Sequence, residues 1–152
     1  MNVRAPRLLT ALAASTLLAL AATGAQARDM VAISKDGVNM RTGAGTQHAV
    51  SWELSKGYPL QVTGRRGDWL RVKDFENDTG WVHRPLTNKQ AHHIVKSNVA
   101  NIRSGPSTNT RVLGRAERGE VLRTLEKRPQ WVKVQQDGGV SGWVSRPLLW
   151  GW

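Results

Sequence analysis

One pattern of residues occurs twice in this chain, and each matched element returns after the same 62 positions. The pattern reads Asn-x-Arg-[Thr/Ser]-Gly-x-x-Thr, then Trp-x-[Arg/Lys]-Val, then Gly-Trp-Val-x-Arg-Pro-Leu. Its three elements begin at Asn39 and Asn101, at Trp69 and Trp131, and at Gly80 and Gly142. An ungapped period predicts two copies of one folding unit rather than one larger domain. A unit of about sixty residues buries little and leaves few residues for catalysis, which argues against most enzymes.

The first 27 residues lie outside both copies. Arg4 and Arg7 precede an apolar run from Leu8 to Ala22, and Ala25-Gln26-Ala27 has the form of a cleavage site. This layout predicts a secretory signal peptide over 1–27, with the exported chain beginning near Arg28. A retained anchor is less favoured, because the apolar run is shorter than the roughly 20 residues that span a bilayer. We therefore expect an exported protein without stable membrane insertion. We favour the periplasm, with full secretion as the alternative.

The absence of cysteine limits the chemistry that this chain can perform. It excludes disulfides, thiolate nucleophiles, cysteine zinc sites and a lipid-attachment thiol. Whatever fold the two copies adopt must be held by packing and hydrogen bonds alone.

Positive charge is unevenly divided between the copies. The chain carries a formal charge of +11; residues 28–87 hold nine basic and seven acidic side chains, and residues 88–152 hold eleven and four. An anionic partner is therefore expected on copy two, although the charge also serves solubility. Outside the cytoplasm the available polyanions are cell-wall polymers, anionic lipids and acidic proteins, and we expect no nucleic acid.

Strand-like alternation dominates both copies. In residues 69–73 and 131–135, apolar and other side chains alternate with period two. This predicts that Leu70 and Val72 enter the core while Trp69 and Arg71 face outward. Further strands are expected at 58–62 and 121–125, with turns at 65–68, 76–78, 128–130 and 137–139. About five short strands per copy, with no helical face, predict an all-β fold of two small barrels, and the Gly-rich segment 42–49 should be a long functional loop.

The two copies resemble the bacterial SH3-like family, which occurs as tandem repeats in exported proteins. The match rests on residues 39–46 and 101–108, followed by the Trp-x-basic-Val and Gly-Trp-Val elements, and it covers Met30 to about Trp150. Copy two matches better, because it has Pro106 where copy one has Ala44. The resemblance implies SH3-like domains at 28–87 and 88–152, each a barrel of five to seven strands. It also implies a binding role, commonly toward peptidoglycan or other envelope components.

Aromatic and basic side chains supply the candidate ligand contacts. Trp69 with Arg71, and Trp131 with Lys133, are expected on an outward strand face, where they would form a platform for a ligand. A packing role for these shared tryptophans stays open, and it is favoured for Trp81 and Trp143. The remaining candidates are Trp52 and Tyr58, which copy two lacks, and Arg41 and Arg103. Each arginine either presents its charge to a ligand carboxylate or, as we favour, binds carbonyls of the long loop.

The ionisable and C-terminal residues complete the candidates. His83, His92 and His93 fit no common zinc spacing and are interpreted as a chance surface cluster, so no metal or cofactor is expected. Asp74, Glu76 and Asp78 are interpreted as a solvated turn rather than a catalytic pair, and no nucleophile elbow is present, so no catalytic residue is proposed. Trp150 is expected to pack across the junction between the copies.

The leading hypothesis is a non-catalytic module that recognises peptidoglycan or another anionic wall polymer through an aromatic and basic surface. Two weak sites on one chain gain avidity, which gives the duplication a purpose. The alternative is an adaptor that docks or regulates an exported enzyme or another envelope protein. The charge difference between the copies favours this alternative, because two equal wall sites would not need it. The sequence does not set the oligomeric state.

Overall fold

The computed structural model describes residues 27–152, so the predicted signal peptide lies almost entirely outside the described residues. Within 27–152 the regular elements are β-strands and two single turns of 3-10 helix. The predicted all-β class is therefore confirmed. No helix in this part of the chain is long and apolar enough to cross a membrane.

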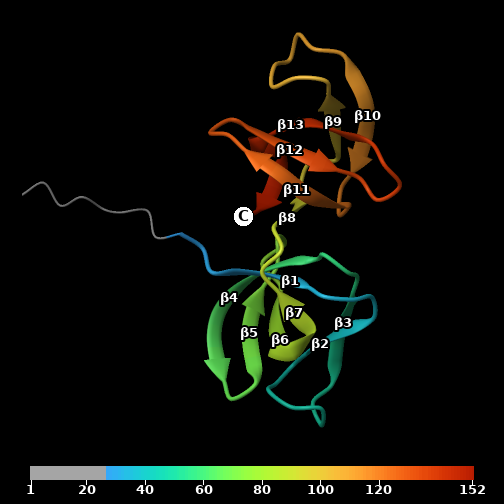
Figure 1. Cartoon of the computed structure of the whole chain (residues 1–152). Coiled ribbons are helices and arrows are strands. Elements are labelled where there is room, and N and C mark those ends of the chain that lie inside the picture. The colour runs from blue at the N-terminus through green and yellow to red at the C-terminus, as the bar shows by residue number, and fades with distance from the viewer. Residues whose placement is uncertain (1–26) are drawn as a thin grey trace, which may run out of the picture.

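The first half of the described chain forms one antiparallel sheet, which we call domain 1 (Figure 1). Its strands follow the order β3-β2-β6-β5-β4-β1-β7. The elements are β1 (Met30–Ile33), β2 (Val38–Arg41), β3 (Val50–Leu54), β4 (Pro59–Arg66), β5 (Trp69–Lys73), β6 (Thr79–His83), η1 (Arg84–Leu86) and β7 (Thr87–Asn88).

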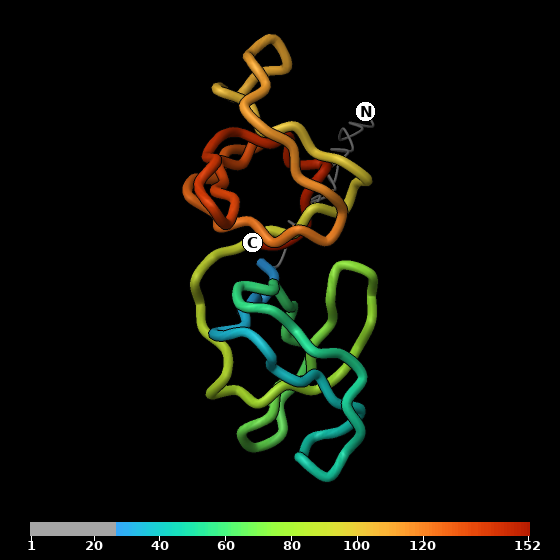
Figure 2. The backbone as a smooth tube through the Cα atoms, turned by 90° about the vertical axis from the view of Figure 1, so that its right-hand side faces the viewer, coloured from blue at the N-terminus to red at the C-terminus, as the bar shows by residue number. Residues whose placement is uncertain are grey.

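Domain 2 repeats this topology with every strand number raised by seven, giving β10-β9-β13-β12-β11-β8-β14. The elements are β8 (His92–Val95), β9 (Val99–Arg103), β10 (Val112–Glu117), β11 (Val121–Lys127), β12 (Trp131–Gln135), β13 (Ser141–Ser145), η2 (Arg146–Leu148) and β14 (Leu149–Gly151). In Figure 2 the backbone of domain 2 runs as a ring around its own centre. The sequence repeat thus corresponds to a repeat of the whole fold.

The two cores follow the predicted alternation. Leu70 and Val72 on β5, and Val132 and Val134 on β12, are buried, while Trp69 and Trp131 lie partly exposed on the opposite face. Each core is made almost entirely of side chains from its own domain. Each domain therefore has its own hydrophobic core.

The shared Gly-Trp pair is explained by the close approach of two strands. A Cβ at Gly142 would lie 2.5 Å from the Arg103 carbonyl oxygen and 2.7 Å from Cγ2 of Ile102. The glycine lets β13 lie against β9, and the next residue, Trp143, then faces Arg103 in the ladder. The same register places Trp81 opposite Arg41 in domain 1. This pairing fixes each arginine at the start of its long loop.

The last strand lies where the domains meet. β14 pairs with β8, and Figures 1 and 2 both place the C-terminus between the two domains. The predicted position of Trp150 at the junction is correct, since the guanidinium of Arg28 lies 5.8 Å from the centre of its ring.

Candidate ligand-binding groove

The long loops are irregular, as predicted, and each is held by one arginine. Nη1 of Arg41 donates hydrogen bonds to the carbonyl oxygens of Thr46 at 3.1 Å and His48 at 2.9 Å. Nη1 of Arg103 donates to those of Thr108 and Thr110, both at 3.0 Å. These are the loop contacts that we favour from the sequence. Among residues 27–152, Nε and Nη2 of both arginines have no hydrogen-bond partner, so each guanidinium keeps donors for a ligand.

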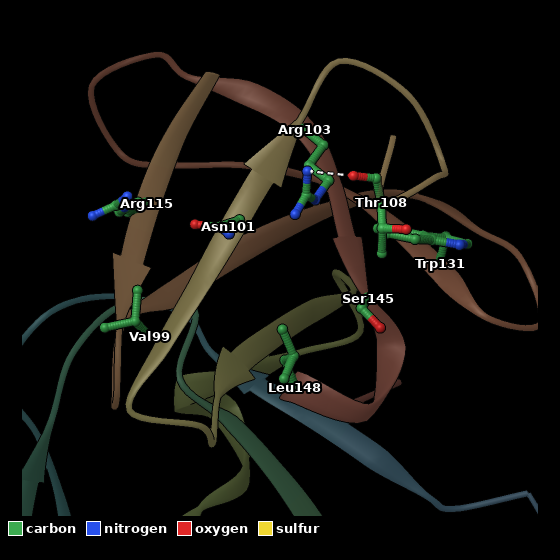
Figure 3. A pocket seen from close by; sticks show the side chains of 8 residues that line it. All are labelled: Val99, Asn101, Arg103, Thr108, Arg115, Trp131, Ser145 and Leu148. Atoms are coloured by element: carbon green, nitrogen blue, oxygen red, sulfur yellow. Dashed lines mark hydrogen bonds between the residues drawn. The ribbon is translucent and has the colours of Figure 1, made fainter. Parts of the chain in front are cut away.

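A groove of about 570 Å³ opens on the surface of domain 2 beside this loop. Figure 3 shows Trp131 at one side, Arg115 at the other, and Asn101 and Arg103 on β9 between them. The groove is lined by Val99, Asn101, Arg103, Thr108, Arg115, Trp131, Ser145 and Leu148. The set combines one large aromatic ring, two guanidinium groups, three neutral polar side chains and two aliphatic ones, with no carboxylate among them. Such a lining suits a ligand with a flat face and a negative charge.

The structure pairs Trp131 with a different cation from the one expected. Lys133 lies two residues along β12 but not in the groove, and in the ladder it faces Trp143. Arg103 on β9 and Arg115 on β10 instead supply the positive charge of the groove that Trp131 lines. These two strands pair with each other, and β13 lies between β9 and the strand of Trp131. In domain 1, Arg71 similarly faces Trp81 in the ladder.

The equivalent surface of domain 1 has different chemistry. Glu53 stands at the position of Arg115, and His83 stands at the position of Ser145. The His83 ring packs against Trp69 with centroids 5.1 Å apart. An imidazole thus covers part of the tryptophan that the serine in domain 2 leaves open, and a carboxylate replaces a cation. The two surfaces therefore differ in charge and in the exposure of the shared tryptophan's ring to its neighbours.

Trp52 and Tyr58 lie apart from the groove. Trp52 is 54% exposed on β3, the edge strand of the domain 1 sheet. Tyr58 packs against the core of domain 1, and its hydroxyl donates a hydrogen bond of 3.2 Å to Oδ2 of Asp74. Burial, with the nearby charge of Asp74, raises the pKa of Tyr58 well above its ordinary value. Its hydroxyl therefore forms a hydrogen bond inside domain 1 and does not face the groove.

The prediction that Asp74 belongs to a solvated turn is wrong. Asp74 is only 5% exposed, and its Oδ1 accepts hydrogen bonds of 2.9 Å from the backbone N–H groups of Glu76 and Asp78. Desolvation raises the pKa of Asp74, although these hydrogen bonds oppose the shift. The carboxylate stabilises the turn by accepting hydrogen bonds from its backbone N–H groups, and these bonds explain why a buried acid occurs in a polar segment.

The histidines do not form a surface cluster, which corrects a second prediction. His93 is 2% exposed, and its Nδ1 lies 2.7 Å from Oγ1 of Thr124. Burial, together with the charges of Arg146, Lys127 and His92, lowers the pKa of His93 to about 4. Within 27–152, no three His, Asp or Glu side chains are grouped as metal ligands would be.

The packing role favoured for the Gly-Trp tryptophans agrees with their surroundings. Trp143 is 6% exposed and lies under the Arg128 guanidinium, 4.5 Å from the ring centre. Trp81 makes the same kind of contact with Arg66 at 5.6 Å.

Arg115 is the charged residue of the groove that was not a candidate from the sequence. It lies outside the repeated motif, and only a position-by-position comparison of the copies, which shows Glu53 exchanged for arginine, singles it out. Asn101, which also lines the groove, stands directly opposite Arg115 in the ladder.

Comparison with known proteins adds a family relationship. A family profile described as a bacterial SH3 domain matches residues 34–89, and a second profile with that description matches residues 97–149. YrvJ of Bacillus subtilis (strain 168), provisionally named as an N-acetylmuramoyl-L-alanine amidase, is 27% identical over 124 residues. That match covers 74% of this chain and 24% of YrvJ, so the chain spans about a quarter of that relative's length.

Solved structures show a more distant likeness. NlpC2 from Trichomonas vaginalis is 15% identical with a TM-score of 0.36, and the match covers 82% of this chain and 48% of that one. An NlpC/P60 family protein from Bacillus cereus is 12% identical with a TM-score of 0.38, covering 80% and 55%.

Proposed function

The chain belongs to the bacterial SH3 domain family, with two domains in tandem, and on that premise we propose that it is a non-catalytic cell-envelope binding protein. The observation that carries the proposal is the groove of domain 2, which Trp131, Arg103 and Arg115 line together with no acidic side chain among the lining residues. The proposed ligand is peptidoglycan or a similar anionic wall polymer.

The chemistry of peptidoglycan fits this groove. The polymer combines sugar rings with peptide stems that carry carboxylates. A sugar or peptide face can pack on the Trp131 ring, and an arginine fork binds a carboxylate through two parallel hydrogen bonds. The relationship to a protein named for N-acetylmuramoyl-L-alanine chemistry supports the same class of ligand.

The composition of the groove supports binding rather than catalysis. Its lining holds no histidine or carboxylate that could transfer a proton in a hydrolytic step. In YrvJ, about three quarters of the chain lies outside the matched region, so that relative has ample room for a separate catalytic part.

Co-sedimentation with purified sacculi tests the proposal. We expect the wild-type protein to pellet with sacculi and Trp131→Ala to pellet about tenfold less strongly, since truncating a central aromatic contact costs roughly 1–2 kcal/mol. Arg115→Gln should weaken pelleting as well. The matched control is Trp69→Ala in domain 1, which should have a smaller effect. A folded Trp131→Ala protein that pellets like the wild type contradicts the proposal.

A second candidate function, docking of an envelope protein, has its own observation. Val50 and Trp52 are exposed on β3, the edge strand of the domain 1 sheet. An exposed apolar edge strand is a common site for adding a partner's strand. In a pull-down from envelope extract, a single stoichiometric protein lost with Trp52→Ala, but retained with Trp131→Ala, would favour this function.

A further inference from the structure

A second cavity, of about 660 Å³, lies at the junction of the domains beside β14. Its interior is formed by buried Leu149 and His93, and the rings of Trp150 and Trp152 line it. It shares no residue with the groove of domain 2.

Four cations line this cavity: Arg28, Lys96, Lys127 and Arg146. Among residues 27–152, none of the four makes an ion pair, and no aspartate or glutamate lines the cavity. Four like charges with no carboxylate side chain among them repel one another, so the site favours an anion.

The cations of domain 1 that correspond to Lys127 and Arg146 do make ion pairs. There, Arg65 and Lys89 both pair with Asp29, and Arg84 pairs with Asp68 at 2.7 Å. The 62-residue offset places Lys127 at the position of Arg65 and Arg146 at that of Arg84. The two acids, however, are replaced by Ala91 and Gln130.

The backbone at both exchanged positions is the same in the two domains. Val62 N–H donates to the Asp29 carbonyl at 2.7 Å, and Thr124 N–H donates to that of Ala91 at 3.1 Å. Likewise Arg84 N–H donates to the Asp68 carbonyl at 2.7 Å, and Arg146 N–H donates to that of Gln130 at 2.9 Å. The carboxylates are absent from domain 2 while these backbone hydrogen bonds remain, so Lys127 and Arg146 make no ion pair among the described residues. Nε of Arg146 donates a hydrogen bond of 3.2 Å to the Arg128 carbonyl oxygen.

Gly151 places the two aromatic rings. Its φ is +150°, and a Cβ there would lie 2.4 Å from the His92 carbonyl oxygen. Trp150 and Trp152 are two residues apart, so they project to the same side of the extended chain. The glycine thus allows β14 to lie against β8 with both rings at the cavity.

We infer that the junction cavity binds a phosphorylated sugar. A phosphate monoester carries more than one negative charge and presents three acceptor oxygens, which suits several cations better than a single carboxylate does. The Arg146 and Arg28 guanidinium groups can bind phosphate oxygens in pairs. The tryptophan rings and the apolar interior offer a flat face to the sugar ring. The phosphorylated sugar can belong to a saccharide or to a glycolipid headgroup.

Calorimetric titration of the whole protein with N-acetylglucosamine 1-phosphate tests this inference. We expect N-acetylglucosamine and inorganic phosphate each to bind at least about tenfold more weakly than the sugar phosphate, because each lacks half of the contacts. The decisive variant is Ala91→Asp with Gln130→Asp, which restores to domain 2 the carboxylates of domain 1. It should bind the sugar phosphate at least about tenfold more weakly.

Two controls separate the site from net charge and from the groove. Asn109→Asp with Arg111→Gln changes the net charge by the same amount on the distant loop, and Trp131→Ala alters only the groove. Both should retain binding. If the double variant does not fold, Lys127→Gln provides a second test, because that side chain is exposed and its loss should not unfold the domain. It should bind the sugar phosphate more weakly than the wild type does.

The inference is overturned if the double variant binds as the wild type does, or if inorganic phosphate alone binds as tightly as the sugar phosphate. Loss of binding in Trp131→Ala would also overturn it, by assigning the ligand to the groove. Vesicles that carry a phosphorylated glycolipid, compared with vesicles of phosphatidylglycerol, distinguish the two sources. Binding to phosphatidylglycerol vesicles that equals binding to the glycolipid contradicts recognition of the sugar.

Discussion

The ring of His83 packs on the ring of Trp69 in domain 1, with centroids 5.1 Å apart and planes inclined at 46°. The equivalent pair in domain 2 is Ser145 and Trp131, and there the tryptophan lines an open groove. The residue on the strand beside the shared tryptophan is therefore one difference between the two surfaces, together with the exchange of Glu53 for Arg115.

Exchanging Ser145 and His83 between the domains should exchange the access of a ligand to the neighbouring tryptophan ring. Ser145→His is expected to place an imidazole over Trp131 and to reduce sacculus pelleting about as much as Trp131→Ala does, by about tenfold. The reciprocal His83→Ser is the control and should leave pelleting by domain 2 unchanged. The hypothesis fails if the two substitutions have equal effects on pelleting.

The close approach of β13 to β9 makes a second prediction. Gly142→Ala would bring a Cβ within 2.5 Å of a backbone oxygen, which cannot move aside as a flexible side chain can. We expect the free energy of unfolding to fall by at least about 2 kcal/mol in urea denaturation. Gly64→Ala is the matched control on β4, because its nearest neighbour would be 3.5 Å away. Equal stabilities for the two variants would contradict this account.

The sequence predicted the fold well because the signals for it are local or repeated. Period-two alternation located β5 and β12, and turn residues located the hairpins around them. The 62-residue offset then required that whatever fold one copy adopts is adopted twice, and the strand orders agree with this.

The buried polar residues could not be predicted in the same way. Asp74 and His93 stand in polar segments, and their burial depends on partners distant in sequence, Tyr58 and Thr124. The candidate site shows the same limit. Trp131 and Arg103 were candidates from the motif, but their meeting with Arg115 depends on the pairing of β9 with β10.

Arg103 supports a prediction about loop order. Replacing it with alanine removes both hydrogen bonds to the carbonyl oxygens of Thr108 and Thr110. We expect a loss of roughly 1–3 kcal/mol in stability and faster amide hydrogen exchange across residues 104–111. Arg111→Ala is the control, since that side chain is exposed on the same loop and makes no hydrogen bond among the described residues. Unchanged exchange in Arg103→Ala would show that the loop is held by other contacts.

His93 makes the stability of domain 2 depend on pH. Its pKa falls from an ordinary 6.5 to about 4 on folding, chiefly through burial and then through the charges of Arg146, Lys127 and His92. Between these values the unfolded chain binds a proton that the folded chain does not. The free energy of unfolding is therefore highest above about pH 6.5 and decreases as the pH falls toward 4. The expected loss is on the order of 3 kcal/mol. Domain 1 supplies the matched variant, His93→Val, because Val31 is buried at the equivalent position. Because His92 is present in both proteins, the difference in unfolding free energy between wild type and variant, measured across this pH range, isolates His93. A difference that stays constant with pH would show that His93 does not change protonation on unfolding.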